Sequence, residues 1–142
     1  MRLPREAMIV VRRGDDVLVV HRSPDQGGYW HQIAGGVEEG ETDAEAARRE
    51  LEEETGLAAD PGPLRHAFAY PLAEEPERRG DYPPGTDSIA VSCFLVDAEP
   101  GWEPRLDWEH DDYRWCPPAE ARALLRWADA ADAVEKLASQ YA

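Results

Sequence analysis

The chain has 142 residues, 42% of them apolar and 32% charged, which suits one globular domain with its own core. Its 30 acidic and 15 basic residues give a net charge of −15, and a surface of that sign repels duplex nucleic acid and anionic membranes. No apolar run approaches the roughly 20 residues of a membrane span, and the N-terminus lacks the apolar core of a secretory signal. We therefore expect a cytoplasmic protein with neither a membrane nor a nucleic acid duplex as its partner.

The first third of the chain has the pattern of short strands. Residues 7–11 and 17–20 are β-branched apolar runs separated by a turn-like cluster, so they predict a β-hairpin. A loop rich in Pro, Gly and Asp is expected at residues 23–29. Residues 29–33 predict a short strand that enters a turn at Ala34-Gly35-Gly36.

A helix is predicted from Asp43 to Thr55. Thr42 with Glu45 three residues later is a capping box, and Gly56 is a typical residue after a helix end. One stripe of this helix, made of Ala44, Ala47 and Leu51, is expected to pack on the core.

The second half of the chain adds more strands and two helices. Strands are predicted at residues 64–72, 88–96 and 112–116, a long loop at 73–87, and helices at 118–127 and 129–140. Cys93 lies within an apolar run, where a thiol is usually a small core residue, and Cys116 has no partner for a disulfide or zinc site. This order of elements predicts an α/β protein with a mixed sheet flanked by helices.

Three carboxylates share one face of the predicted helix. Glu50, Glu53 and Glu54 are spaced i, i+3 and i+4, and like charges at that spacing repel one another by a few tenths of a kcal/mol per pair. A hard divalent cation would reverse the effect, because Mg²⁺ and Mn²⁺ prefer clustered carboxylate oxygens and substrate phosphates. The pattern predicts a metal site at these three residues.

The carboxylates belong to a longer motif. Residues 35–57 read Gly35-x5-Glu41-x7-Arg49-Glu50-Leu51-x-Glu53-Glu54-x-Gly56-Leu57. This spacing matches the Nudix box at every defined position. By this motif the chain resembles the Nudix hydrolases, and we expect residues 1–142 to form a single domain of that kind.

The resemblance implies an α/β/α sandwich and Mg²⁺- or Mn²⁺-dependent hydrolysis of a small nucleoside-diphosphate-linked substrate. It implies that Glu50, Glu53 and Glu54 bind the metal, with a backbone carbonyl near Ala34 and Gly35 as a further ligand. Arg49 can reach Glu53 at i+4, and Glu41 is expected to support the site from just before the helix. Gly35 and Gly36 are expected to let the backbone approach phosphate. Whether the protein forms a homodimer stays open.

Further residues outside the box have expected roles. Family members take the general base either from the box or from a glutamate on a later loop, and the later candidate is Glu109, which we also expect to bind the metal. The neighbouring His110 is expected to be structural or exposed to solvent. Arg22 is expected to bind phosphate. Expected base contacts come from Tyr29, Trp30 and Gln32, although aromatic residues there are equally often core.

The substrate is harder to predict from the residues. Tyr29-Trp30 before the box, Tyr82-Pro83-Pro84-Gly85-Thr86, and Glu109-His110 with Arg114-Trp115 resemble the dihydroneopterin triphosphate/dATP pyrophosphohydrolase branch. That branch implies release of a monophosphate and pyrophosphate. ADP-ribose and diadenosine-polyphosphate hydrolases carry a Pro or Tyr some way past the box, and Tyr70-Pro71 lies near that distance.

Two other classes of function remain as alternatives. A Nudix-like sensing module would bind a nucleotide without turnover, but such regulators usually carry an added DNA-binding region, and the complete carboxylate set favours chemistry. Isopentenyl diphosphate isomerases share the fold and need a positioned catalytic cysteine. Neither Cys93 nor Cys116 has the surroundings of an activated thiol.

Overall fold

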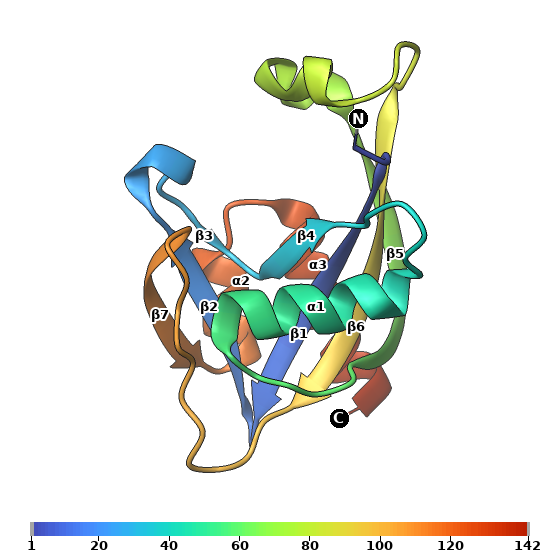
Figure 1. Ribbon diagram of the computed structural model, residues 1–142. Helices are drawn as coiled ribbons and strands as arrows, with labels where there is room; N and C mark the ends of the chain where they lie inside the picture. The colour runs from blue at the N-terminus through green and yellow to red at the C-terminus, as the bar shows by residue number, and fades with distance from the viewer. Residues whose placement is uncertain (1, 142) are drawn as a thin grey trace.

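The computed structural model describes residues 2–141, with the side chains of residues 77 and 138–141 outside the description. One mixed sheet lies between helix α1 on one face and helices α2 and α3 on the other (Figure 1). The strands are β1 (Arg5–Arg13), β2 (Asp16–Arg22), β3 (Trp30–His31), β4 (Ile33–Gly36), β5 (Gly62–Pro71), β6 (Ser88–Asp97) and β7 (His110–Cys116). The helices are α1 (Asp43–Thr55), α2 (Pro118–Leu124) and α3 (Ala128–Tyr141). The expected α/β/α sandwich is confirmed.

The sheet opens where the first hairpin diverges. β1 and β2 pair only next to their turn, at Arg12–Val17 and Arg13–Asp16. Further along, β4 pairs antiparallel with β1 over Glu6–Ile9, and β3 pairs with β2. β1 and β6 are parallel along their length, and β7 continues the sheet beyond β2. The segment of β3 and β4 therefore fills the gap in the hairpin and brings Gly35 next to α1.

Helix α1 begins and ends where the sequence predicts. The Thr42 hydroxyl accepts a hydrogen bond from the Glu45 backbone N–H, the Glu45 side chain accepts one from the Thr42 backbone N–H, and Gly56 follows with a left-handed φ of 81°. The stripe of buried residues differs from the expected one, because Ala44 is exposed and Ala46 is buried instead, beside Ala47 and Leu51. The helix is thus rotated about its own axis relative to the expected orientation, and its buried stripe extends to Glu54.

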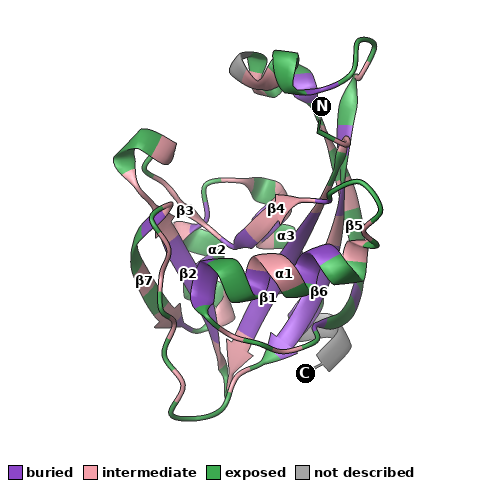
Figure 2. Ribbon diagram, in the orientation of Figure 1, coloured by how far each residue is buried: buried purple, intermediate pink, exposed green. Residues whose placement is uncertain are grey.

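Alternating residues of the central strands point into two separate hydrophobic cores, one on each face of the sheet. On β1, Met8 and Val10 face the core under α2 and α3, while Ala7, Ile9 and Val11 face the core under α1. Buried residues concentrate on the central strands and on the inner side of α1 (Figure 2). This packing fixes α1 rigidly across the sheet.

Four details correct the sequence-based boundaries. Ala34-Gly35-Gly36 is a strand paired with β1 and not a turn, because its backbone completes the opened hairpin. The expected loop at 73–87 contains two short 3₁₀ helices, Leu72–Glu74 and Pro76–Asp81. Helix α2 ends at Leu124, and β7 begins two residues early, at His110, where pairing with β2 continues past a register shift. None of the described helices has the length and hydropathy of a membrane span.

Candidate active site

The site is built around the contact between Glu50 on α1 and Gly35 on β4. A Cβ atom at position 35 would overlap the Glu50 carboxyl group, so only glycine lets the strand and this side chain lie so close. The Glu50 carboxylate also accepts a hydrogen bond from Arg49 Nη1 at 2.9 Å. Burial raises the pKa of Glu50 although Arg49 opposes the shift.

Glu54 lies one turn further along α1 and is almost completely buried, with 2% of its surface exposed. Its carboxyl group lies within hydrogen-bonding reach of Glu50, yet neither of its oxygens has a hydrogen-bond partner among the described residues. Burial, then the neighbouring Glu50, raise its pKa well above the ordinary value. Two neighbouring carboxylates, of which Glu54 has no donor, fit a divalent cation that both could bind.

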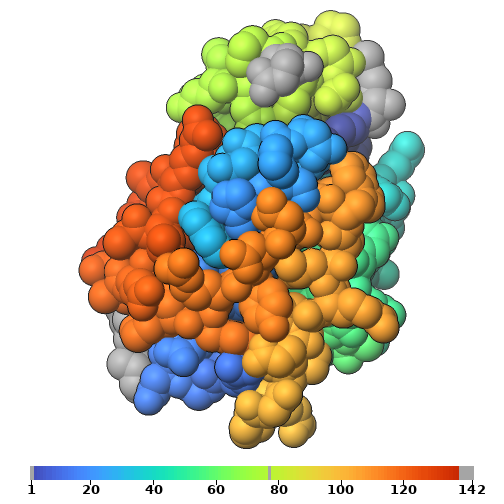
Figure 3. Space-filling model, turned by 90° about the vertical axis from the view of Figure 1, so that its left-hand side faces the viewer, coloured from blue at the N-terminus to red at the C-terminus, as the bar shows by residue number. Residues whose placement is uncertain are grey.

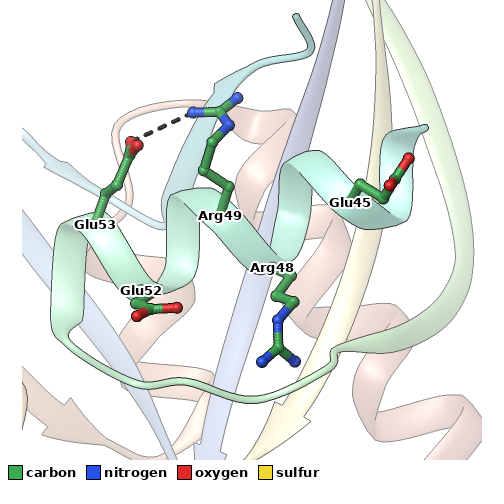
Figure 4. A pocket seen from close by; sticks show the side chains of 5 residues that line it. All are labelled: Glu45, Arg48, Arg49, Glu52 and Glu53. Atoms are coloured by element: carbon green, nitrogen blue, oxygen red, sulfur yellow. Dashed lines mark hydrogen bonds and ion pairs between the residues drawn. The ribbon is translucent and has the colours of Figure 1, made fainter. Parts of the chain in front are cut away.

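Glu53 lies outside the buried pair. Its side chain is 57% exposed and receives a hydrogen bond of 3.3 Å from Arg49 Nη1, as the i+4 spacing predicts. Figure 4 shows the two side chains extending together from α1, beside a shallow hollow of about 390 Å³ over the outer face of the helix. Among the described residues, no three His, Cys, Asp or Glu side chains are already gathered as metal ligands.

Arg49 connects the helix to the loop before it. Its guanidinium donates to both oxygens of Glu41, at 2.7 and 3.0 Å, and to the Gly36 carbonyl at 2.9 Å. The hydrogen bond from Arg49 holds the pKa of Glu41 below its ordinary value. A second hollow of about 340 Å³ opens on this side, lined by Gly36 and Glu50 among others. Glu41 therefore contacts Arg49 directly, and its supporting role in the site stays a prediction.

Glu109 lies in a turn directly before β7, and its charge contributes to the raised pKa of Glu54. The structure thus brings it near the box carboxylates. Its side chain is 3.9 Å from Arg22 Nη2, and its backbone carbonyl accepts a hydrogen bond from the Ser23 N–H. Figure 3 shows the two segments side by side, residues 22–30 in blue and the stretch near residue 110 in orange. Arg22 also donates two hydrogen bonds to Gln26.

The expected base-binding residues divide into two kinds of environment. Tyr29 and Trp30 are half-buried, with Arg126 over the Tyr29 ring at 5.2 Å and Arg114 over the Trp30 ring at 5.2 Å. Trp30 packs against the core under α2 and α3. Gln32 is 1% exposed, and neither polar atom of its amide has a hydrogen-bond partner among the described residues. Among the described residues, no hydrogen bond, ion pair or ring contact joins these three side chains to the carboxylates.

Sequence reasoning missed the environment of His110. It is not exposed to solvent: its side chain is 1% exposed, with Nδ1 at 2.9 Å from Asp107 and Nε2 at 3.6 Å from Glu54. The Asp107-x-x-His110 spacing, which suits a turn closed by its own side chains, was the available signal. His31 is a partly buried histidine, whose pKa is lowered to about 4 by burial and then by the nearby Arg22 and His110.

Comparisons with known proteins agree on the family. A family model described as the NUDIX domain matches residues 2–137. An RNA pyrophosphohydrolase of Aeromonas hydrophila is 32% identical over 79% of this chain and 68% of its own length. A Myxococcus xanthus octanoyltransferase is 40% identical over 75% of this chain, which spans only 28% of that relative. The structure of the E. coli dihydroneopterin triphosphate pyrophosphohydrolase superposes with a TM-score of 0.80 at 26% identity, covering 95% of this chain and 94% of that one.

Proposed function

Because this chain belongs to the Nudix hydrolase family, whose members act on phosphoanhydrides, we propose that it hydrolyses a nucleoside or pterin triphosphate to a monophosphate and pyrophosphate. The observation that carries the proposal is the buried pair of Glu50 and Glu54, pressed together beside Gly35 without a hydrogen-bond donor for Glu54. The likeness to the E. coli pyrophosphohydrolase supports a triphosphate as substrate.

The residues that would hold Mg²⁺ or Mn²⁺ are Glu50 and Glu54, joined by Glu53 once it leaves Arg49. When bound, such a cation neutralises charge on phosphate oxygens and lowers the pKa of a water at the site. The net charge of −15 makes this neutralisation necessary, since the bare protein would repel a polyphosphate.

The protein's own side chains would orient the substrate and take up the proton. Arg22 would donate to a phosphate oxygen, as it does now to the Gln26 carbonyl. Arg49 would hold the loop at Gly36, and with it the approach of the backbone to phosphate. A carboxylate oxygen of Glu53 or Glu109 would accept the proton of the attacking water, because both side chains are accessible, at 57% and 32% exposure.

A second candidate substrate is the 5′-triphosphate end of an RNA strand. The specific observation in its favour is the 32% identity with the A. hydrophila RNA pyrophosphohydrolase. The net charge of −15 repels a long nucleic acid strand, so we rank a small triphosphate first. ADP-ribose and diadenosine polyphosphates remain in the substrate panel as family alternatives.

The proposal is tested by Glu53→Gln and Glu54→Gln, assayed with each candidate substrate and with Mg²⁺ or Mn²⁺. Both variants should keep the fold, and kcat should fall by orders of magnitude. Asp60→Asn is the matched control. Asp60 follows helix α1 in the chain and forms an exposed ion pair with Arg48, which lies on that helix. Near-normal turnover in both glutamine variants would refute the metal assignment.

A further inference from the structure

Behind the carboxylate pair, the partly buried Asp107 and the buried His110 and Glu54 form a line from the turn before β7 to α1. Asp107 Oδ1 lies 2.9 Å from His110 Nδ1, and His110 Nε2 lies 3.6 Å from Glu54 Oε1. The histidine and glutamate side chains are only 1% and 3% exposed. The same turn includes Glu109, so one short segment contacts the site twice.

The two polar groups of the contact between His110 and Glu54 have no hydrogen-bond partner at the facing atoms among the described residues. Nε2 of His110 and both oxygens of Glu54 are buried polar atoms without a hydrogen bond. Leaving such buried atoms without a hydrogen bond is energetically unfavourable. A closure of about 0.7 Å would bring Nε2 and Oε1 to an ordinary hydrogen-bond length. One hydrogen between them, carried by either atom, would then satisfy both.

Asp107 determines how the imidazole ring is oriented. A carboxylate only accepts hydrogen bonds, so the hydrogen of this contact lies on Nδ1 and the ring presents Nε2 to Glu54. The turn is closed by the His110 N–H on the Asp107 carbonyl, and it is anchored by Ser23, which donates to the Trp108 and Glu109 carbonyls. The ring cannot rotate without breaking the contact to Asp107.

We propose that His110 is a positioning residue that fixes the carboxylate of Glu54, with Asp107 fixing the His110 ring. The inference rests on the proposed function, in which Glu54 holds the divalent cation. Side chains that orient a metal-binding carboxylate through hydrogen bonds typically contribute 10- to 100-fold in metal affinity or activity. A histidine that only filled space in the core would make no such contribution.

Two replacements of the histidine separate positioning from packing. In His110→Gln, the amide group can reach the place of Nε2 and form a hydrogen bond with the Glu54 carboxyl group. In His110→Asn, the shorter amide reaches only the place of Nδ1. Asp111→Asn is the matched control, since Asp111 forms the same kind of contact with His21, 2.7 Å long, on the partly exposed side of β7.

The measurement is the affinity for Mn²⁺ without substrate, from the electron paramagnetic resonance signal of free Mn²⁺, together with kcat, KM and the melting temperature in EDTA. We expect His110→Asn to weaken Mn²⁺ binding about 10- to 100-fold and to lower kcat more than it raises KM. His110→Gln should recover much of the affinity, and Asp111→Asn should match the unchanged protein.

Three results would overturn the proposal in distinguishable ways. If folded His110→Asn binds Mn²⁺ as tightly as the unchanged protein while Glu54→Gln does not, the positioning role is wrong and the proposed function stands. Equal losses in both histidine variants, in parallel with equal losses in melting temperature, would likewise reduce His110 to packing. If Glu54→Gln leaves Mn²⁺ binding unchanged, the metal assignment fails and the positioning role fails with it.

Discussion

The Arg49 guanidinium donates two hydrogen bonds to the Glu41 carboxylate, from Nε to Oε2 at 2.7 Å and from Nη2 to Oε1 at 3.0 Å. The same side chain donates to Glu50, Glu53 and the Gly36 carbonyl. A single arginine thus ties the loop before α1 to two of the three box carboxylates, and the geometry depends on the planar fork of its donors.

Replacing Arg49 by lysine should therefore disrupt the site more than the fold. An ammonium group keeps the charge but cannot bind Glu41 at two points while also reaching Gly36. We expect kcat to fall at least about 10-fold with little change in melting temperature. Arg48→Lys is the control, because Arg48 lies on the same helix and pairs with the exposed Asp60 rather than with a box carboxylate. Equal kinetics for the two lysine variants would contradict the role given to Arg49.

Gly35→Ala tests the contact between β4 and Glu50. The new methyl group would overlap the Glu50 carboxyl group, so that side chain must move away from Glu54. Mn²⁺ affinity, measured by titration calorimetry, should drop by at least about 10-fold. Gly80→Ala is a matched change, since a Cβ there meets no atom within 4 Å. Unaltered Mn²⁺ binding in Gly35→Ala would show that Glu50 is not a ligand.

His31 should make the fold sensitive to mild acid. Its pKa is lowered to about 4 in the folded protein, against 6.5 in the unfolded chain, so the unfolded state binds more protons between these values. The stability that the folded protein gains from a neutral His31 is fully present above pH 6.5 and is lost as the pH falls toward 4. By pH 5 the free energy of unfolding has fallen by roughly 2 kcal/mol from this source.

Urea unfolding of the protein and of His31→Gln at pH 7 and pH 5 measures this contribution. The difference in unfolding free energy between the two pH values should be smaller in the variant, by roughly 2 kcal/mol. Carboxylates with raised pKa values, such as Glu54, change stability in the opposite direction in both proteins and cancel in this comparison. An identical pH dependence in both proteins would contradict the lowered pKa of His31 in the folded protein.

Cys93 should be inert in the native protein. Burial and the nearby Asp129 raise the pKa of its thiol to about 12, so only about one molecule in ten thousand carries a thiolate at pH 8. Iodoacetamide should modify Cys93 only after unfolding in urea, as mass spectrometry of the peptides can report. Rapid labelling of the native protein at Cys93 would revive the alternative of cysteine chemistry.

The sequence predicted those parts of the molecule that depend on local signals. Helix α1 was predicted to its first and last residue, because the Thr42–Glu45 capping box and Gly56 define both ends independently of the rest of the fold. The Arg49–Glu53 contact followed in the same way from helical spacing.

Features that depend on tertiary contacts were beyond the sequence. The rotation of α1, which buries Ala46 and exposes Ala44, is set by packing against the sheet. Ala34-Gly35-Gly36 is a strand because β1 and β2 diverge and leave a gap for it, and no local pattern encodes that gap. The burial of His110 against Glu54 joins segments more than 50 residues apart, so only the folded chain displays it.

The most direct test of the central claim identifies the products by ³¹P nuclear magnetic resonance. The purified chain would be incubated with Mg²⁺ or Mn²⁺ and, separately, with dATP, dihydroneopterin triphosphate, a 5′-triphosphate RNA, ADP-ribose and diadenosine tetraphosphate. We predict that a nucleoside or pterin triphosphate yields its monophosphate and pyrophosphate, and that Glu54→Gln yields neither. Release of orthophosphate in place of pyrophosphate, or no turnover of any compound with either metal, would contradict the proposed reaction.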